Sequence, residues 1–193
     1  MRRSTLLCAG LAIAGMLLGA SAASAAPGWQ PPSIYQMQQS GDRPLASPIP
    51  RQTVAFSGPY APGTIVINTS ERRLYFVLGD HQALKYGVGV GRPGFTWAGA
   101  SYIANKREWP DWTPPPQMLR RRPDLPRHMV GGIDNPLGAR AMYIAGTLYR
   151  IHGSNEPDTI GQAVSSGCIR MTNDDVIDLY GRANVGARVV VLR

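Results

Sequence analysis

The sequence predicts a mainly β domain, a sandwich or barrel interrupted by a few short helices. From about position 63 onward, short runs rich in β-branched and aromatic residues recur, and turns that contain glycine or polar residues separate them. Helical signals are few, and each covers only a short segment. Many short strands joined by tight turns are typical of sandwiches and barrels rather than of alternating α/β folds.

The clearest strands form two successive hairpins. Runs at 64–68 and 73–78 flank a short polar connection at 69–72, and a second turn at 79–82 leads into a run at 83–90. We expect further strands in the C-terminal half of the chain, at 141–145, 148–152 and 187–192.

Three short helices are predicted among these strands. Thr113 is placed to cap a helix over 114–119, whose first positions are prolines. A helical turn is expected at 156–161. The strongest helical signal is 173–180, with Asn173 as the N-cap and acidic residues in the first turn, where the helix dipole favours them.

The N-terminal end has the pattern of a secretory signal peptide at 1–25. Arg2 and Arg3 precede an apolar run at 6–20, and small residues at 23–25 offer a cleavage site. An uncleaved membrane anchor is the alternative, but the run is shorter than the ~20 residues that a spanning helix needs. We therefore expect an exported, periplasmic protein without a stable membrane anchor after cleavage.

Two segments follow this leader. Residues 26–62 are rich in proline, glutamine and serine and predict a linker, although a strand packed on the domain near 53–56 is an alternative. Residues 63–193 form the predicted catalytic domain. Removing the two arginines of the leader lowers the formal net charge from +8 to +6.

A basic exported protein suggests an anionic partner such as cell wall or membrane surface. No sequence motif for nucleic-acid binding is visible, so nucleic acid is not expected as a partner. Three histidines and one cysteine outside the leader are too few for a typical structural zinc site, and no cofactor or metal is expected.

Cys168 is the one cysteine outside the leader, and His152 lies sixteen positions before it. An unpaired thiol is unusual in an exported protein, which makes Cys168 a candidate nucleophile and His152 its candidate base. Gly167 lets the backbone turn sharply, and the N–H groups of Gly167 and Cys168 are candidate oxyanion donors. A buried structural cysteine and a structural histidine are the alternatives.

These residues stand in a recognisable pattern. The sequence resembles the L,D-transpeptidase (YkuD-type) catalytic domain, a family of bacterial cell-wall enzymes, over roughly 63–193. The likeness is carried by a glycine-rich segment at 87–91, by the run 136–138, and above all by two motifs: His-Gly-Ser-Asn at 152–155 and Ser-Ser-Gly-Cys-Ile-Arg-Met at 165–171. The resemblance implies an L,D-transpeptidase-like β-sandwich or barrel.

The resemblance also implies a reaction. Cys168 would attack a peptidoglycan stem tetrapeptide between its third residue, a diamino acid, and the terminal D-alanine, forming a thioester. An amine would resolve it, from a neighbouring stem to give a 3→3 cross-link, or from an envelope lipoprotein or outer-membrane protein. His152 corresponds to the family's general base and acid, and the carbonyl of Gly153 corresponds to the group that orients it.

The roles of four further residues stay open. Ser166 stands where many family members have a second histidine, and it is a candidate for shaping the oxyanion site. Arg170 is a candidate for binding a substrate carboxylate, or for pairing with Asp174 or Asp175. Two aromatic residues complete the predicted site: Trp112 in a lid loop or a packed surface loop, and Tyr143 in the cleft or the core.

Two other functions fit the same residues. Water could resolve the thioester, which would make the protein an L,D-carboxypeptidase or a cross-link hydrolase. Alternatively, the domain is a catalytically silent wall-binding module that keeps the fold as a scaffold. The preserved set of His152, Gly167 and Cys168 argues for catalysis.

Overall fold

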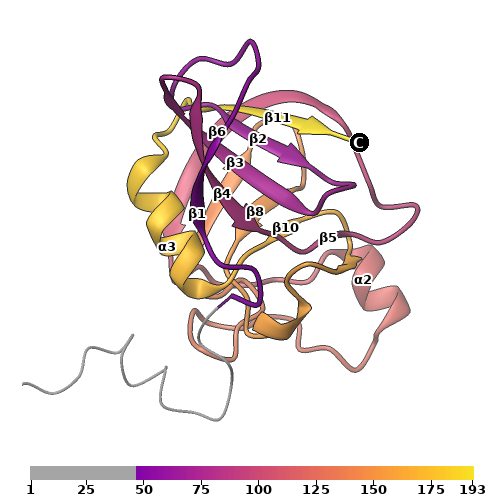
Figure 1. Cartoon of the computed structure of the whole chain (residues 1–193). Helices are drawn as coiled ribbons and strands as arrows, with labels where there is room; N and C mark the ends of the chain where they lie inside the picture. Colours follow the sequence, from indigo (N-terminus) through magenta and orange to yellow (C-terminus); the bar gives the residue numbers. More distant parts are fainter. Residues whose placement is uncertain (1–46) are drawn as a thin grey trace, which may run out of the picture.

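The computed structural model describes residues 47–193. The leader predicted at 1–25, and positions 26–46 of the predicted linker, lie outside the described residues. The described part is mainly β (Figure 1). Its elements are β1 (Gln52–Ala55), β2 (Ile65–Asn68), β3 (Arg73–Gly79), β4 (Gln82–Gly87), β5 (Val90–Gly91), β6 (Gly99–Glu108), α2 (Pro116–Arg121), β7 (Arg140–Ile144), β8 (Arg150–His152), the 3₁₀ turn η1 (Pro157–Thr159), β9 (Ala163–Ser165), β10 (Ile169–Arg170), α3 (Asn173–Arg182) and β11 (Arg188–Leu192).

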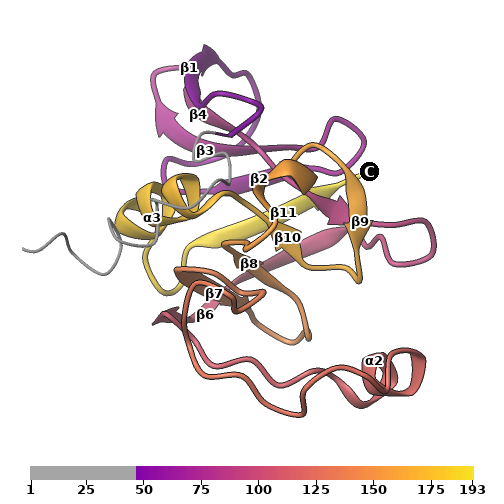
Figure 2. The same ribbon diagram turned by 90° about the horizontal axis from the view of Figure 1, so that it is seen from below.

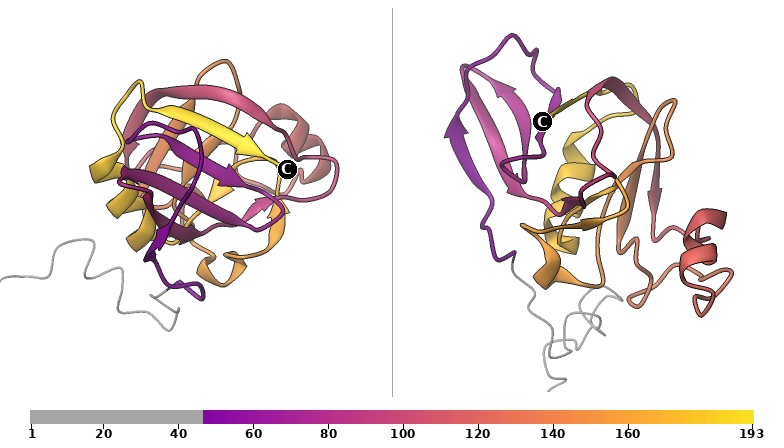
Figure 3. Two further views of the ribbon diagram at one scale, coloured as in Figure 1. Left: turned by 45° about the horizontal axis from the view of Figure 1, so that its top comes forward. Right: turned by 90° about the vertical axis from the view of Figure 1, so that its right-hand side faces the viewer.

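One sheet of nine strands runs through the described residues in the order β1-β4-β3-β2-β11-β6-β7-β8-β10. The long strand β6 pairs with β11 near its start and with β7 along its second half, with a register shift between Ile103 and Asn105. The sheet therefore turns at β6, and its two parts face each other in Figures 2 and 3.

A bridge between distant strands nearly closes this sheet into a barrel. Gly89, just after β4, exchanges two backbone hydrogen bonds of 2.9 Å with Arg170 in β10. The core lies between the two parts of the sheet and includes Tyr86, Ile103 and Met142, all fully buried. This arrangement agrees with the predicted β-sandwich or barrel.

Helix α3 covers part of this core through Val176 and Leu179, which are both buried. Its N-cap is Thr172, whose hydroxyl accepts a hydrogen bond from the N–H of Asp175, so the prediction of Asn173 as the cap was wrong by one residue. At the other end, Lys106 of β6 donates to the last carbonyls of the helix, those of Tyr180 and Ala183.

Most of the predicted elements are present. Both hairpins form, β2 with β3 and β3 with β4, and the strand considered near 53–56 exists as β1, paired with β4. Thr113 does not cap α2: Pro115 precedes that helix and no side chain caps it. The sequence did not predict β6. None of the helices in residues 47–193 is long and apolar enough to span a membrane.

Candidate active site

The sharp turn before β10 presents Cys168, a free and half-buried thiol. The buried hydroxyl of Ser165 fixes this turn, because it donates to the carbonyl of Cys168 at 2.7 Å and accepts from the N–H of Gly167 at 3.1 Å. The N–H of Gly167 thus has a partner within the turn, and its role as an oxyanion donor stays a prediction. Among the described residues, the N–H of Cys168 has no hydrogen-bond partner. Ser165 was not predicted as a site residue.

Gly167 is required by both its backbone angle and its surroundings. Its φ of +112° lies in the region that favours glycine, and a Cβ there would lie 2.2 Å from the ring of Tyr149. Tyr149 stacks on Trp97, with ring centroids 5.3 Å apart, and the indole N–H of Trp97 donates to the carbonyl of Gly167 at 3.3 Å. Two aromatic rings that the sequence did not single out therefore hold the turn from one side.

A parallel pairing between two short strands brings the histidine to this turn. In β8 and β10, Ile151 lies opposite Ile169 and His152 lies opposite Arg170. Extending this register by one residue puts Cys168 level with Arg150, and the close approach of Gly167 to Tyr149 agrees with it. Since side chains alternate along strands, Arg150 and His152 share one face with Cys168 and Arg170, whereas Ile151 and Ile169 point into the core.

Strand β7 extends this face. Tyr143 lies opposite Arg150, and the Arg150 guanidinium carbon lies 5.3 Å from the centre of the Tyr143 ring. Tyr143 is half-buried, and its neighbour Met142 points into the core. The predicted site residue Tyr143 is therefore on the same face of the sheet as Cys168 and His152.

One hydrogen bond sets the tautomer of His152. Its Nδ1 lies 2.6 Å from the carbonyl oxygen of Gly153. A carbonyl oxygen can only accept, so Nδ1 carries the proton and Nε2 is left with a free lone pair. The ring therefore has the form needed to take a proton from a thiol.

Burial keeps this imidazole neutral. His152 is only 4% exposed, and desolvation, aided by the positive charges of Arg170 and Arg150, lowers its pKa to about 3 against the opposing hydrogen bond to Gly153. The ring is thus uncharged over the whole physiological pH range. A neutral imidazole with a free lone pair on Nε2 can accept a proton during a nucleophilic attack.

Gly153 packs closely against the start of α3. A Cβ on Gly153 would lie 2.3 Å from Oδ1 of Asn173, and so would a Cβ on Gly138. The same Oδ1 accepts a hydrogen bond from the N–H of Ala139 at 2.9 Å, and the N–H of Gly153 donates to the carbonyl of Arg140. These contacts fix the backbone carbonyl that orients His152.

The remaining polar residues of the predicted site have partners from other elements. Arg170 forms an ion pair with Glu156 at 2.8 Å, so its partner is neither Asp174 nor Asp175. The hydroxyl of Ser166 accepts a hydrogen bond of 3.4 Å from Arg92, whose guanidinium also lies over the ring of Phe95.

The long connection between β6 and β7, residues 109–139, forms an arm that carries α2 and projects beside the sheet (Figure 2). Trp112 within it is only 7% exposed, and its backbone pairs with that of Met129 through two hydrogen bonds of 2.8 Å, so its side chain is buried in this structure. The side-chain amide of buried Asn135 ties the arm together by donating to three of its carbonyls. Arg121 of α2 reaches the ring of Phe95, close to Ser166.

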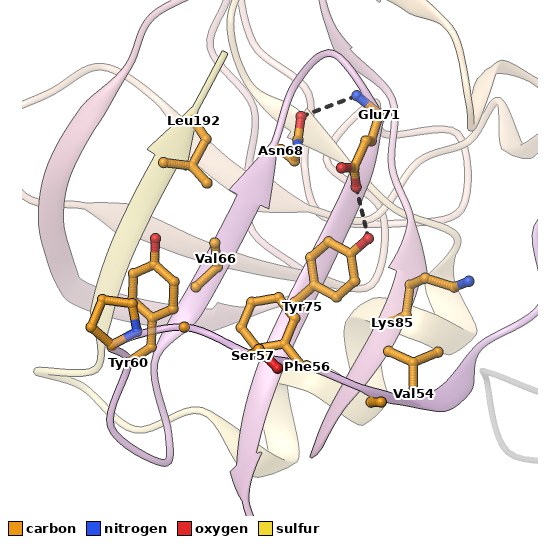
Figure 4. A pocket seen from close by; sticks show the side chains of 13 residues that line it. Val54, Phe56, Ser57, Tyr60, Val66, Asn68, Glu71, Tyr75, Lys85 and Leu192 are labelled. Carbon is orange, nitrogen blue, oxygen red and sulfur yellow. Dashed lines mark hydrogen bonds between the residues drawn. The ribbon is translucent and has the colours of Figure 1, made fainter. Parts of the chain in front are cut away.

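A separate hollow lies away from this site, over β2, β3 and β4 (Figure 4). Its volume is about 540 Å³, and Phe56 and Tyr75 stack in its wall with ring centroids 4.9 Å apart. None of the predicted site residues lines it. The chemistry of Cys168 and His152 therefore belongs to a different surface of the molecule.

The geometry of this site agrees with the chain's similarity to known proteins. Residues 62–191 match the YkuD family, described as the L,D-transpeptidase catalytic domain, and the chain belongs to this family. A probable L,D-transpeptidase of Escherichia coli, ErfK/SrfK, is 39% identical over 137 residues, which are 66% of this chain and 43% of that protein. The chain thus spans less than half the length of that relative.

Two solved structures add to this result. A protein of Brucella melitensis, described as a probable carnitine operon oxidoreductase CaiA, is 47% identical, with a TM-score of 0.50 over 74% of this chain and 92% of its own. The catalytic domain of the Enterococcus faecium L,D-transpeptidase has a TM-score of 0.53 at 23% identity, covering 70% of this chain and all of that domain. The latter likeness shows the fold alone.

Proposed function

We propose that this protein is an exported L,D-transpeptidase that acts on peptidoglycan stem tetrapeptides in the periplasm. The observation that carries the proposal is the parallel pairing of β8 with β10, which sets Cys168 and His152 on one face of the sheet, together with the bond from Nδ1 of His152 to Gly153. Membership of the L,D-transpeptidase family supports the substrate class.

In the proposed acylation, the sulfur of Cys168 attacks the carbonyl carbon of the third residue while Nε2 of His152 takes the thiol proton. The negative charge passes to the carbonyl oxygen, which accepts a hydrogen bond from the N–H of Cys168. The C–N bond then breaks, Nε2 returns its proton to the departing nitrogen, and D-alanine leaves. A thioester on Cys168 remains.

In the second half, an amine attacks the thioester. Nε2 of His152 takes a proton from the amine, the C–S bond breaks, and the sulfur of Cys168 recovers its proton from the imidazole. An amine on a neighbouring stem gives a 3→3 cross-link, and an amine of an envelope protein gives attachment of that protein to the wall. Water gives a tripeptide.

Mass spectrometry of the intact protein tests this proposal. Exposure to a disaccharide tetrapeptide should add the mass of the donor minus D-alanine to the wild-type protein and nothing to Cys168→Ala. Adding a second stem peptide as the acceptor should convert the adduct into a 3→3 dimer. Tripeptide as the sole product would assign the protein as a carboxypeptidase, and no adduct with the tetrapeptide or with a carbapenem would support a silent wall-binding module.

A further inference from the structure

Arg150 occupies a prominent place beside the candidate nucleophile. The register of β8 and β10 sets it level with Cys168, two residues before His152 on the same strand face. Its guanidinium lies against the ring of Tyr143 on the neighbouring strand β7. A cation therefore lies in the row of side chains that shares one face of the sheet with Cys168.

This cation has no counter-ion among residues 47–193. Its Nε is fully covered and makes no hydrogen bond there, although the side chain as a whole is only half-buried. The terminal nitrogens are thus the part of the guanidinium that solvent or a ligand reaches. A charged group held partly out of water without a partner is costly, and such a group in a native protein calls for an explanation.

The neighbouring arginines differ from Arg150 in this respect. Arg170, on the same face, is held by Glu156 at 2.8 Å, and Arg140, at the start of β7, is held by Glu108 at 3.1 Å. Glu156 and Glu108 are therefore each engaged with another arginine, and no carboxylate of residues 47–193 forms an ion pair with Arg150. The guanidinium of Arg150 is thus available to an anion of the substrate.

We propose that Arg150 binds a free carboxylate of the donor peptide next to the scissile bond and so selects for an anionic stem. This inference rests on the proposed function and names the residue that recognises the substrate in it. A guanidinium can hold a carboxylate through two parallel N–H···O bonds, which fixes both position and orientation. The ring of Tyr143 holds the guanidinium ready for this contact, so little side-chain entropy is lost on binding.

Two carboxylates of a stem tetrapeptide can fill this position: that of the C-terminal D-alanine and one on the side chain of the third residue. The test separates them with three synthetic tetrapeptides, one with both groups free, one amidated at the C-terminus and one amidated at the side chain. Binding is measured by calorimetry on the full-length mature protein carrying Cys168→Ser, with and without Arg150→Gln. Arg107→Gln, an exposed arginine on β6, is the matched control.

We expect Arg150→Gln to weaken binding of the free peptide by about 10- to 100-fold, in the range for hydrogen bonds to charged groups. With Arg150 present, one of the two amidated peptides should bind more weakly than the free peptide by the same factor. Arg150→Gln should not weaken the binding of that amidated peptide further. Arg150→Lys keeps the charge but cannot form two parallel hydrogen bonds to a carboxylate. Its affinity for the free peptide should therefore lie between those of the parent protein and Arg150→Gln. The control should bind all three peptides like the parent.

The inference would be refuted if Arg150→Gln weakened the binding of all three peptides equally, or weakened none of them. It would also be refuted if the parent protein bound none of the peptides. Failure of the proposed function gives a different result. In that case the peptides bind with the expected dependence on Arg150, and the protein with Cys168 intact forms no thioester from them. Circular dichroism of each variant verifies that the fold is retained.

Discussion

The neutral, buried imidazole of His152 gives a measurable prediction about stability. Well above pH 6.5, its ordinary pKa, the ring is uncharged in both the folded and the unfolded protein. Below that value the unfolded ring takes up a proton, whereas burial, with the charges of Arg170 and Arg150, holds the folded pKa at about 3. The unfolded state therefore binds more protons, and the protein loses stability as the pH falls from 6.5 toward 3.

The magnitude follows from one proton per molecule. Each pH unit within this window removes about 1.4 kcal/mol from the free energy of unfolding. Between pH 6.5 and pH 4.5 the loss attributable to His152 is therefore about 2 kcal/mol, a large share of the 5–15 kcal/mol typical of a domain. His152→Asn removes this loss because its amide N–H can still donate to the carbonyl of Gly153 but does not titrate.

Urea unfolding followed by tryptophan fluorescence at several pH values measures this effect. The difference in unfolding free energy between wild type and His152→Asn should change by about 1.4 kcal/mol per pH unit below pH 6.5. Carboxylates that titrate in both proteins cancel in that difference. Parallel curves for wild type and His152→Asn would refute the reasoning.

Three further substitutions probe the turn and the arm. Gly167→Ala forces a Cβ to within 2.2 Å of the Tyr149 ring at a φ of +112°, so we expect a loss of about 2–4 kcal/mol in unfolding free energy and of thioester formation; wild-type stability would contradict this. Ser165→Ala removes two hydrogen bonds around Cys168, and thioester formation should slow at least tenfold with a smaller loss of stability, as measured by mass spectrometry and urea unfolding. Asn135→Ala leaves three carbonyls of the arm without their donor and should destabilise the protein by about 2–3 kcal/mol, with faster proteolysis confined to the arm; uniform protection of the arm would count against its role.

The local sequence pattern predicted the secondary-structure elements that depend mainly on neighbouring residues. The two hairpins followed from β-branched runs separated by short turns, and both formed as expected. Strand β6 was missed because only Ile103 among its ten residues is buried, so its sequence has little hydrophobic alternation. The cap of α3 was displaced by one residue, since Asn173 uses its side chain to hold Ala139 instead.

For the site, the sequence by itself determined the reactive groups: a lone thiol, a glycine before it and a His–Gly pair. Only the tertiary structure decided how they meet. The packing of the whole barrel determines the parallel register of β8 and β10, and no local sequence pattern encodes this register. The same packing buried Trp112, which lies in the arm, and paired Arg170 with Glu156. Arg150, level with the thiol, has no ion-pair partner among residues 47–193. Residue types are a property of the chain, but their neighbours are a property of the fold.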